Sequence, residues 1–269
     1  MSELANFEQT AKDFGNPNWV AYQTIVRTEV RRFTRIWVQT LIPPAITMTL
    51  YFVIFGSLIG RRIGDMGGFD YMAYIVPGLI MMSVITNSYA NVSSSFFGAK
   101  FGRFVEEMLV SPISNQTILL GYVTGGVARA LSVAVIVTIL SMFFTHLALY
   151  NLLAVVSITL LTAVLFSLLG FINGVYAKRF DDVSIVPTFV LTPLTYLGGV
   201  FFSIDLLPEF WAGVAQLNPI LYVVNAFRFG ILGVSDVSLT GAYVTLVSMT
   251  VVAYLVALRL LTQGAGVRS

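Results

Sequence analysis

The side chains that could do chemistry are few in this sequence, and their types exclude the commonest catalytic sites. The chain has no cysteine and a single histidine, His146, so it offers neither a thiol nucleophile nor a set of metal ligands. It lacks the G-x-x-x-x-G-K-S/T loop that holds the phosphates of ATP. No pair of carboxylates stands inside a long apolar segment, where hydrolysis within a membrane would need one. We therefore expect no enzyme activity, cofactor or metal ion in this chain.

Four arginines mark the first charged segment, residues 19–37. Apolar side chains recur there at steps of three and four residues, which is one face of an α-helix. That face comprises Trp19, Tyr22, Val26, Val30, Phe33 and Trp37. Arg27, Arg31 and Arg35 follow one another away from it, with Arg32 beside them. The pattern predicts a helix in the membrane interface, its arginines toward anionic headgroups. It is either a basic anchor alone or also a contact for a cytosolic partner.

A second charged segment, residues 97–118, predicts a short amphipathic helix. Glu106 and Glu107 precede an apolar stretch that Pro112 terminates. A helix with acidic and hydrophobic parts suits a groove on another protein. The alternative is a helix that lies flat beneath the membrane.

Long uncharged segments separate these two and follow them. Residues 130–177 carry no charged side chain, and as one helix they would measure about 72 Å, more than twice the ~30 Å hydrocarbon core. They must therefore fold back near His146, which we expect in an external turn. Of all residues 57% are hydrophobic and only 10% are charged, against about 25% charged in soluble domains. The fold class expected is all-α integral membrane.

Six segments are long and apolar enough to span, within one membrane domain at residues 19–262. They are 38–60, 71–96, 119–145, 149–176, 183–203 and 237–260. Polar tails at 1–18 and 263–269 flank this domain. Residues 210–227 are also uncharged, but Asn218-Pro219 interrupts them. They predict re-entrant half-helices between the fifth and sixth spans, since irregular backbone survives at membrane depth only where protein or water satisfies it.

The distribution of lysine and arginine predicts the orientation. The termini and the 97–118 and 177–182 loops together hold eleven: Lys12, Arg27, Arg31, Arg32, Arg35, Lys100, Arg103, Lys178, Arg179, Arg259 and Arg268. The opposite set holds three: Arg61, Arg62 and Arg228. Because cytosolic loops carry the excess of positive charge, both termini are expected in the cytoplasm.

Arg129 stands between the second charged segment and the long uncharged run, and two placements are open. If a span begins at Leu119, Arg129 lies about 15 Å deep, at a cost of at least ~2.5–3.5 kcal/mol at the membrane centre. If the helix instead projects into the cytosol, residues 130–149 span alone and Arg129 lies at the interface. We favour the second placement.

Three motifs follow one another along the chain. The first is Glu106-Glu107-Met108-Leu109-Val110-Ser111-Pro112-Ile113-Ser114. The second runs from Lys178-Arg179-Phe180-Asp181-Asp182 through Pro187 and Pro193 to Leu197-Gly198-Gly199-Val200-Phe201-Phe202. The third is Leu217-Asn218-Pro219-Ile220-Leu221-Tyr222, with Phe227-Arg228 after it. In order and spacing these motifs resemble those of ABC-2 type transporter permeases, and within that family the inner-membrane transport permeases of enterobacteria. The likeness covers nearly the whole chain from about residue 19.

The resemblance implies one half of an ATP-driven exporter in the bacterial inner membrane. In that family the permease dimerises, and each copy docks on a separate ATPase subunit that binds the ATP and magnesium. The interfacial helix and the 100–112 coupling helix meet that subunit. The coupling residues would be Arg103, Glu106, Glu107, Met108, Leu109 and Pro112. A pathway at the dimer interface, opened by alternating access, has as its hinge and lining candidates Pro77, Asn87, Pro187, Pro193, Gly198, Gly199, Asn218 and Pro219.

Two other classes of membrane protein stay open on the residues alone. A transporter driven by an ion gradient would normally bury ionisable groups in the membrane, and every Asp and Glu here falls in an expected loop, terminus or interfacial helix. A gated channel or scaffold is less firmly excluded. Aromatic residues at 13% favour an amphipathic, lipid-linked or drug-like cargo, although lipid-facing Phe accounts for the same number. The partners expected are the ATPase, a second copy and lipid, with no nucleic acid.

The orientation can be tested directly because the chain has no cysteine of its own. Single cysteines at Ser2, Ser114 and Ser269 should be protected from an impermeant thiol reagent in intact cells, whereas those at Gly67 and Ser235 should react. The reverse labelling pattern would invert the topology, and reaction at both Ser2 and Ser235 would contradict an even number of crossings.

Overall fold

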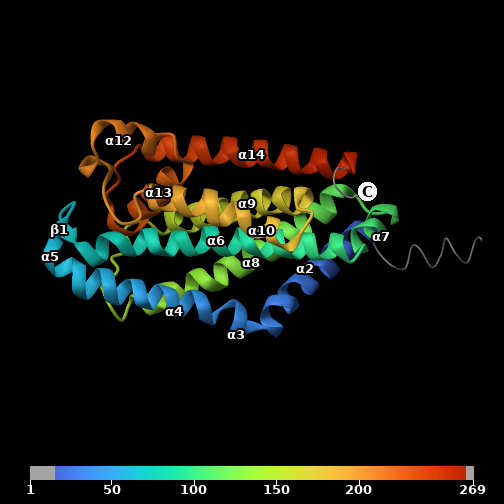
Figure 1. The fold of residues 1–269 in the computed structure, drawn as a ribbon, viewed down its shortest axis with the longest axis horizontal. Helices are drawn as coiled ribbons and strands as arrows, with labels where there is room; N and C mark the ends of the chain where they lie inside the picture. The colour runs from blue at the N-terminus through green and yellow to red at the C-terminus, as the bar shows by residue number, and fades with distance from the viewer. Residues whose placement is uncertain (1–15, 265–269) are drawn as a thin grey trace, which may run out of the picture.

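The computed structural model describes residues 16–264, and the tail residues 1–15 and 265–269 lie outside the described part. The described chain is a bundle of long helices that run along one axis (Figure 1). The first described helix begins and the last one ends at the same end of the bundle, beside α7. A small antiparallel hairpin, β1 (Asp65–Met66) with β2 (Phe69–Asp70), lies at the opposite end.

Among the described residues, five helical stretches are long and apolar enough to cross a membrane, by length and composition. Four are single helices: α6 (Tyr71–Phe101), α8 (Asn115–Ser141), α9 (Leu152–Tyr176) and α14 (Leu239–Gln263). The other, Trp37–Gly60, joins α3 (Trp37–Thr40), α4 (Ile42–Tyr51) and the π-helix η1 (Phe52–Gly60). Five of the six predicted spans therefore have a counterpart of suitable length. The integral membrane all-α class is confirmed.

The predicted fifth span, residues 183–203, is wrong as one long helix. Its place is taken by α10 (Phe180–Val186), the π-helix η2 (Pro187–Leu191) and α11 (Thr192–Tyr196), which follow one another without a gap. At 1.5 Å per residue these helices measure about 25 Å, short of the ~30 Å hydrocarbon core. The chain then turns at 197–203 and enters the short 3-10 helix η3 (Ile204–Leu206). Pro187 supplies no N–H and interrupts the α-helical hydrogen bonding at η2, and the helix ends before Gly198-Gly199, where Gly199 has a φ of 70°.

Residues 210–227 form two helices, as the Asn218-Pro219 pair predicted. They are α12 (Glu209–Gln216) and α13 (Pro219–Leu232). Asn218 caps α13 by accepting a hydrogen bond from the N–H of Ile220 at 3.0 Å, and Pro219 occupies the first helical position. The placement of this pair within a membrane stays a prediction.

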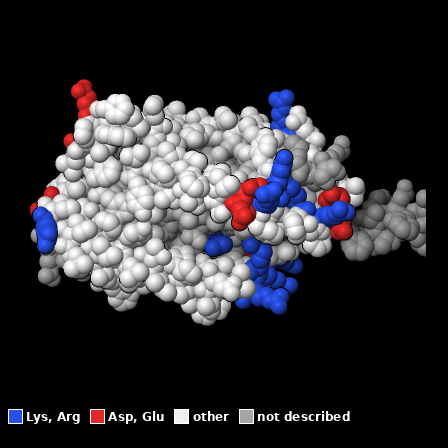
Figure 2. Space-filling view, in the orientation of Figure 1, with Lys and Arg blue, Asp and Glu red and all other residues white. Residues whose placement is uncertain are grey.

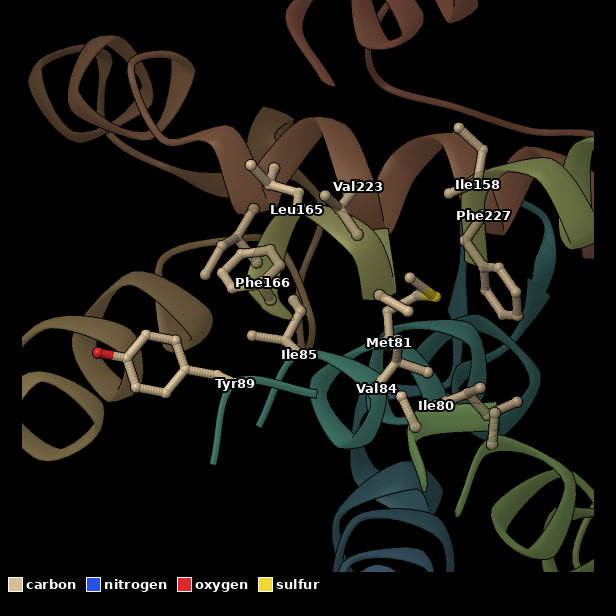
Figure 3. Close-up of a cluster of buried hydrophobic side chains, with 14 of the residues drawn as sticks. Ile80, Met81, Val84, Ile85, Tyr89, Ile158, Leu165, Phe166, Val223 and Phe227 are labelled. Carbon is tan, nitrogen blue, oxygen red and sulfur yellow. The ribbon is translucent and has the colours of Figure 1, made fainter. Parts of the chain in front are cut away.

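Helix α6 forms the centre of the bundle, with α8, α9 and α13 packed around it. Figure 3 shows its side chains Ile80, Met81, Val84 and Ile85 facing Phe166 and other apolar residues of the neighbouring helices, all of them buried. The helix has 31 residues, hence about 46 Å of length, so it extends past a ~30 Å core. A buried central helix fixes the relative positions of the others.

Helices α6 and α9 approach each other closely at Gly170. A Cβ added at Gly170 would collide with the backbone carbonyl of Tyr89, which cannot move away as a flexible side chain would. Small residues at such crossings are the usual device for close packing in membranes, where dispersion rather than the hydrophobic effect holds helices together. Gly170 therefore sets the distance between the two helices.

We expect Gly170→Ala to destabilise the detergent-solubilised protein by about 1–3 kcal/mol, the ordinary cost of overpacking. The matched control is Gly98→Ala in α6, where an added Cβ meets nothing within 4 Å and a better helix former replaces glycine. Thermal loss of monodisperse protein, followed by size-exclusion chromatography, measures both. Equal stability of the two variants would contradict the close α6–α9 contact.

Candidate functional site

Charged side chains gather at one end of the bundle. Figure 2 shows them concentrated where α2 (Pro17–Arg35), α7 (Phe104–Val110) and the turn between α9 and α10 meet, with few along the sides. The two charged segments that sequence analysis singled out are thus neighbours in space.

Helix α7 lies where the coupling helix was predicted, but it is shorter than residues 100–112. Arg103 has a left-handed backbone, with φ of 61°, and turns the chain from the end of α6 into α7. Glu106 and Glu107 stand exposed in the first turn of α7, and no ion pair engages them within residues 16–264. Acidic side chains in a first turn are favourable toward the helix dipole. Both carboxylates are free to meet another molecule.

The remaining predicted coupling residues divide between surface and interior. Met108 and Leu109 are half-buried and pack on the core, and Pro112 is exposed just after the helix. Two apolar side chains of α7 project outward instead, because Phe104 is 60% and Val110 86% exposed. The outer surface of α7 therefore combines two carboxylates with exposed apolar side chains, the composition of a docking surface.

Helix α2 packs along α8 through a face that overlaps the predicted apolar one in part. Gly121 and Gly125 of α8 let Ile25 and Glu29 approach closely, and Tyr22 of the predicted face shares a 3.0 Å hydrogen bond with Thr124. Trp19 and Trp37, at the two ends of the predicted face, are 58% and 54% exposed, and their placement in the acyl boundary stays a prediction. The two glycines open space for α2 where a hydrophobicity pattern shows none.

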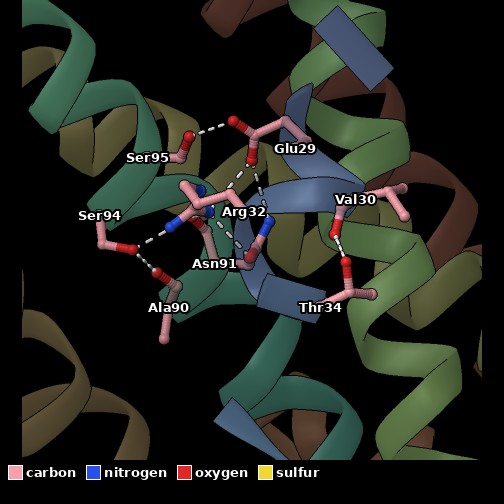
Figure 4. A network of polar contacts seen from close by, with 8 residues as sticks. All are labelled: Glu29, Val30, Arg32, Thr34, Ala90, Asn91, Ser94 and Ser95. Carbon is pink, nitrogen blue, oxygen red and sulfur yellow. Dashed lines mark hydrogen bonds and ion pairs between the residues drawn. The ribbon is translucent and has the colours of Figure 1, made fainter. Parts of the chain in front are cut away.

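A buried carboxylate joins α2 to α6 (Figure 4). Glu29 is 3% exposed and accepts hydrogen bonds from Ser95 Oγ and, at 3.3 Å, from Asn91 Nδ2. Its ion pair with Arg32 measures 3.1 Å. Arg32 Nη2 also donates to the backbone oxygen of Asn91 at 3.0 Å and to its Oδ1 at 2.9 Å. A buried charge is tolerated when it is paired and hydrogen-bonded in this way.

This network corrects the prediction for Arg32. Arg27, Arg31 and Arg35 are exposed, as a face toward headgroups requires, whereas Arg32 turns inward to Glu29 and Asn91. Sequence reasoning missed Glu29 altogether. Its spacing of three residues from Arg32 was the available signal, since such pairs face each other on a helix.

A cavity of about 590 Å³ lies between α2, α7 and the end of α6. Thr28, Arg32, Ser94, Phe104 and Met108 are among the residues that line it. Helix α7 and the ion pair of α2 therefore border the same space. A displacement of α7 would alter the α2–α6 network through the residues that line this cavity.

Arg129 lies near the middle of α8, fourteen residues after Asn115 and twelve before Ser141. The favoured placement, in which residues 130–149 span alone, is wrong because the helix ends at Ser141 and the remainder is about 18 Å long. Arg129 Nη2 donates to Oδ1 of Asn87 at 3.2 Å, and its Nε has no partner in the described part of the chain. Asn87, a pathway candidate, is thus buried in a contact between α6 and α8.

A side chain of α9 donates a hydrogen bond to α10, just before the irregular helical segment that joins α10 to α11. Pro187 offers no N–H to the carbonyl of Val183, four residues earlier, and Asn173 Nδ2 donates to that carbonyl at 3.2 Å instead. Thr192 donates both its backbone N–H and, at 2.9 Å, its hydroxyl to the carbonyl of Pro187. Pro193 lies one residue further on. A π-helix of this kind is frequent at functional sites. Pro187 and Pro193 stay the predicted hinge.

The turn after α11 is held by residues of α13. Asn218 Nδ2 donates to the carbonyl of Leu194 at 2.5 Å, and Gly198 lies against Ile220. Gly199 has a φ of 70°, which only glycine adopts without strain. Four pathway candidates, Gly198, Gly199, Asn218 and Pro219, are therefore brought together where α11 meets α13. Pro77 is buried within α6 next to Gly78, which lies against the backbone of Val200, the residue after Gly199.

Arg228 is the site residue that sequence analysis placed wrongly, in an external loop. It is fully buried in α13, and Nη2 donates to the carbonyl of Gly199 at 2.6 Å. Nε donates to the carbonyl of Tyr74 at 3.3 Å and Nη1 to Asn225 Oδ1 at 3.2 Å. The guanidinium carbon also lies 3.9 Å from the centre of the Tyr74 ring. A lone cation in an otherwise apolar helix was the signal, since such residues are almost always paired inward.

Within residues 16–264 no group of three His, Asp or Glu side chains is close enough to hold a metal ion. His146 lies in the segment between α8 and α9.

Comparison with known proteins adds the family. Residues 20–232 match the family described as ABC-2 type transporter. The inner membrane transport permease YadH of Escherichia coli strain K12 is 60% identical over 251 residues, which cover 93% of this chain and 98% of the relative. Nodulation protein J of Rhizobium leguminosarum bv. trifolii is 24% identical over 225 residues, 83% of this chain and 85% of the relative. The resemblance to ABC-2 permeases and to the enterobacterial type is confirmed.

The Glu29 network generates a stability prediction for α2. We expect Glu29→Ala to weaken the attachment of α2 to α6 by about 2–3 kcal/mol, because it removes hydrogen bonds to a charged group. Hydrogen exchange of α2 amides, read by mass spectrometry, should become faster by at least tenfold. Arg31→Ala on the exposed face is the control and should leave exchange unchanged. Unaltered protection in Glu29→Ala would remove the network from any role in holding α2.

Proposed function

Because this chain belongs to the ABC-2 type transporter family and is a multi-pass transport permease of the inner membrane, we propose that it is the membrane half of an ATP-driven exporter. Two copies would pair with two copies of a separate ATPase subunit. Cargo would leave the cytoplasm or the inner leaflet by alternating access. The proposal assigns ATP and magnesium to the partner, since this sequence has no phosphate-binding loop.

The outer surface of α7 is the observation that carries the proposal. It presents Glu106 and Glu107 beside exposed Phe104 and Val110 at the charged end of the bundle. A helix of mixed acidic and apolar surface fits a groove in a soluble partner, where the apolar groups supply burial and the carboxylates fix register. This end would be the cytosolic one, as the lysine and arginine count predicts.

Movement at α7 has a structural route toward the membrane. Met108 borders the same cavity as Arg32, and Arg32 is bonded to Asn91 of the central helix α6. Packed helices adopt discrete arrangements and do not deform continuously. A displacement at one end of the central helix α6 would therefore be transmitted along the bundle. The break at Pro187 and Pro193 would absorb the change of backbone angles.

The pathway we propose follows the interface between two copies, beside α4, η1 and α11. The Trp37–Gly60 stretch is the least buried of the five described candidate spans, so most of its apolar surface remains to be covered by lipid or by a second copy. An aromatic group lies where it approaches α11. Tyr51 and Tyr196 share a hydrogen bond of 3.3 Å, and the rings of Phe55 and Phe201 have centroids 4.6 Å apart. Aromatic and hydroxyl groups together suit an amphipathic, lipid-linked or drug-like cargo.

Charge reversal on α7 tests the coupling. We expect Glu106→Arg with Glu107→Arg to leave the protein folded and inserted, because both side chains are exposed. The double variant should retain at most about a tenth of the wild-type association with the ATPase encoded beside it, since like charges across an interface cost several kcal/mol. Co-purification of the ATPase and cargo-stimulated ATP hydrolysis in reconstituted vesicles are the two measurements.

Glu209→Arg provides the matched control. Glu209 is an exposed carboxylate at the start of α12, near the opposite end of the bundle, and its reversal should change neither measurement. Wild-type association of the double variant would show that α7 is a plain connector. Transport that proceeds without any ATPase and follows an ion gradient would support the secondary-transporter alternative instead.

A further inference from the structure

A second cavity lies deeper in the bundle, within one copy of the chain. Its volume is about 450 Å³, within the range of small-molecule sites. Helices α6, α9, α13 and α14 and the broken segment α10–η2–α11 supply its walls. Most of the lining is aliphatic or aromatic, and Tyr89 and Asn173 contribute its polar groups apart from the hydroxyl of Tyr176.

The hydroxyl of Tyr89 is the unexplained group in this cavity. The residue is 2% exposed, and its hydroxyl lies near the Asn173 amide but has no acceptor for its proton within residues 16–264. Asn173 lines the same cavity, but its amide nitrogen already donates to Ser93 Oγ at 3.0 Å and to the carbonyl of Val183 at 3.2 Å. In Figure 3 the Tyr89 ring points away from the apolar cluster of α6, with its oxygen outermost. Buried hydroxyls are rarely left unpaired, so we expect a hydrogen-bond acceptor to bind beside the hydroxyl of Tyr89.

The cavity has a polar end and an apolar end. Tyr89 lies eighteen residues after Tyr71 in α6, hence about 27 Å along the helix and close to one hydrocarbon thickness from its start. Asn173 lies three residues before the end of α9, near the charged end of the bundle. Pro219 begins α13, and Met249 is near the middle of α14. The polar groups therefore face the headgroup region of one leaflet, and the apolar lining extends toward the membrane centre.

A cavity with one polar and one apolar end suits a membrane lipid better than a water molecule. An ordered water needs two to four polar partners, and this lining is mostly apolar. A phospholipid provides an ester carbonyl, which accepts a hydrogen bond, joined to an acyl chain. The turn that follows α9 carries Lys178 and Arg179, both exposed, so cations stand beyond the polar end, where a phosphate group would lie.

We propose that this cavity binds one acyl chain of an inner-leaflet phospholipid, with the lipid's ester carbonyl accepting the hydrogen bond of Tyr89. The acyl chain lies between α9 and the π-helix η2, against Pro219 and Met249. Bound there, the lipid packs on the proline-broken segment and completes its wall. This inference concerns binding to the chain itself and requires neither the ATPase nor transport.

A photoreactive lipid tests the site. Purified chain is reconstituted in vesicles of phosphatidylethanolamine containing a diacyl phosphatidylethanolamine with a diazirine on one acyl chain, then irradiated, and the labelled peptides are identified by mass spectrometry. We expect labelling of the cavity-lining Leu169, Val190 and Met249 to exceed that of Leu255, which is 57% exposed on α14 and lines none of the described cavities.

Two variants separate a built site from lipid that merely surrounds the protein. Tyr89→Phe keeps the ring and should reduce cavity labelling about two- to tenfold, the loss expected for one hydrogen bond, while labelling at Leu255 is unchanged. Val186→Trp fills the cavity and should nearly abolish labelling of the lining. Leu255→Trp is the matched control on the lipid-facing surface and should leave cavity labelling as in the wild type.

The proposal is overturned if cavity labelling is no greater than labelling at Leu255, or if Tyr89→Phe and Val186→Trp both leave it unchanged. Size-exclusion profiles and helical content establish that each variant is folded. Because Tyr89→Phe removes a single oxygen, a folding defect in Val186→Trp would leave the test intact.

Discussion

Backbone groups that lose their helical partners must find others inside the protein, because hydrocarbon offers none and each unsatisfied group costs several kcal/mol. This chain interrupts a helix at Pro187 and ends one before the turn at 197–203, and neighbouring helices satisfy the freed carbonyls. Asn173 of α9 donates a hydrogen bond to the carbonyl of Val183, and Asn218 donates one to the carbonyl of Leu194. Arg228 of α13 donates one to the carbonyl of Gly199. The irregular backbone that a transporter needs for movement is therefore tied to rigid elements.

Buried charge obeys the same constraint. Glu29 is held by Arg32, Asn91 and Ser95, and Arg228 by carbonyls and an aromatic ring. A buried ion pair adds little net stability, yet breaking it is expensive because a charge is left uncompensated. Such contacts therefore specify one arrangement of helices more than they strengthen it. At the α2–α6 contact they define how α2 is seated, next to the cavity that α7 also borders.

The same reasoning distinguishes Tyr89 from its neighbours. Asparagines 87, 91, 173, 218 and 225 all engage backbone or side-chain groups in the described chain. The hydroxyls of Tyr89, Thr162 and Ser167 have no partner in the described chain, and of these three residues only Tyr89 lines one of the described cavities. In a bundle whose other breaks are satisfied from within, an unpaired hydroxyl that faces a cavity indicates a partner from outside the chain.

The sequence by itself determined the membrane class, the positions of most long helices and the two charged segments. Hydrophobic length and helical periodicity depend on the local chain alone, and Asn218-Pro219 indicates a break by the chemistry of its own residues. Only the tertiary structure decided how far the helix through Pro187 runs, which helix face is covered and which polar atoms meet. The bond of Arg32 to Asn91, that of Arg129 to Asn87 and that of Arg228 to Gly199 each depend on a group far away in sequence. Periodicity records how apolar a face is, but a glycine such as Gly125 or an acceptor such as the carbonyl of Gly199 creates a polar contact that only packing brings into reach.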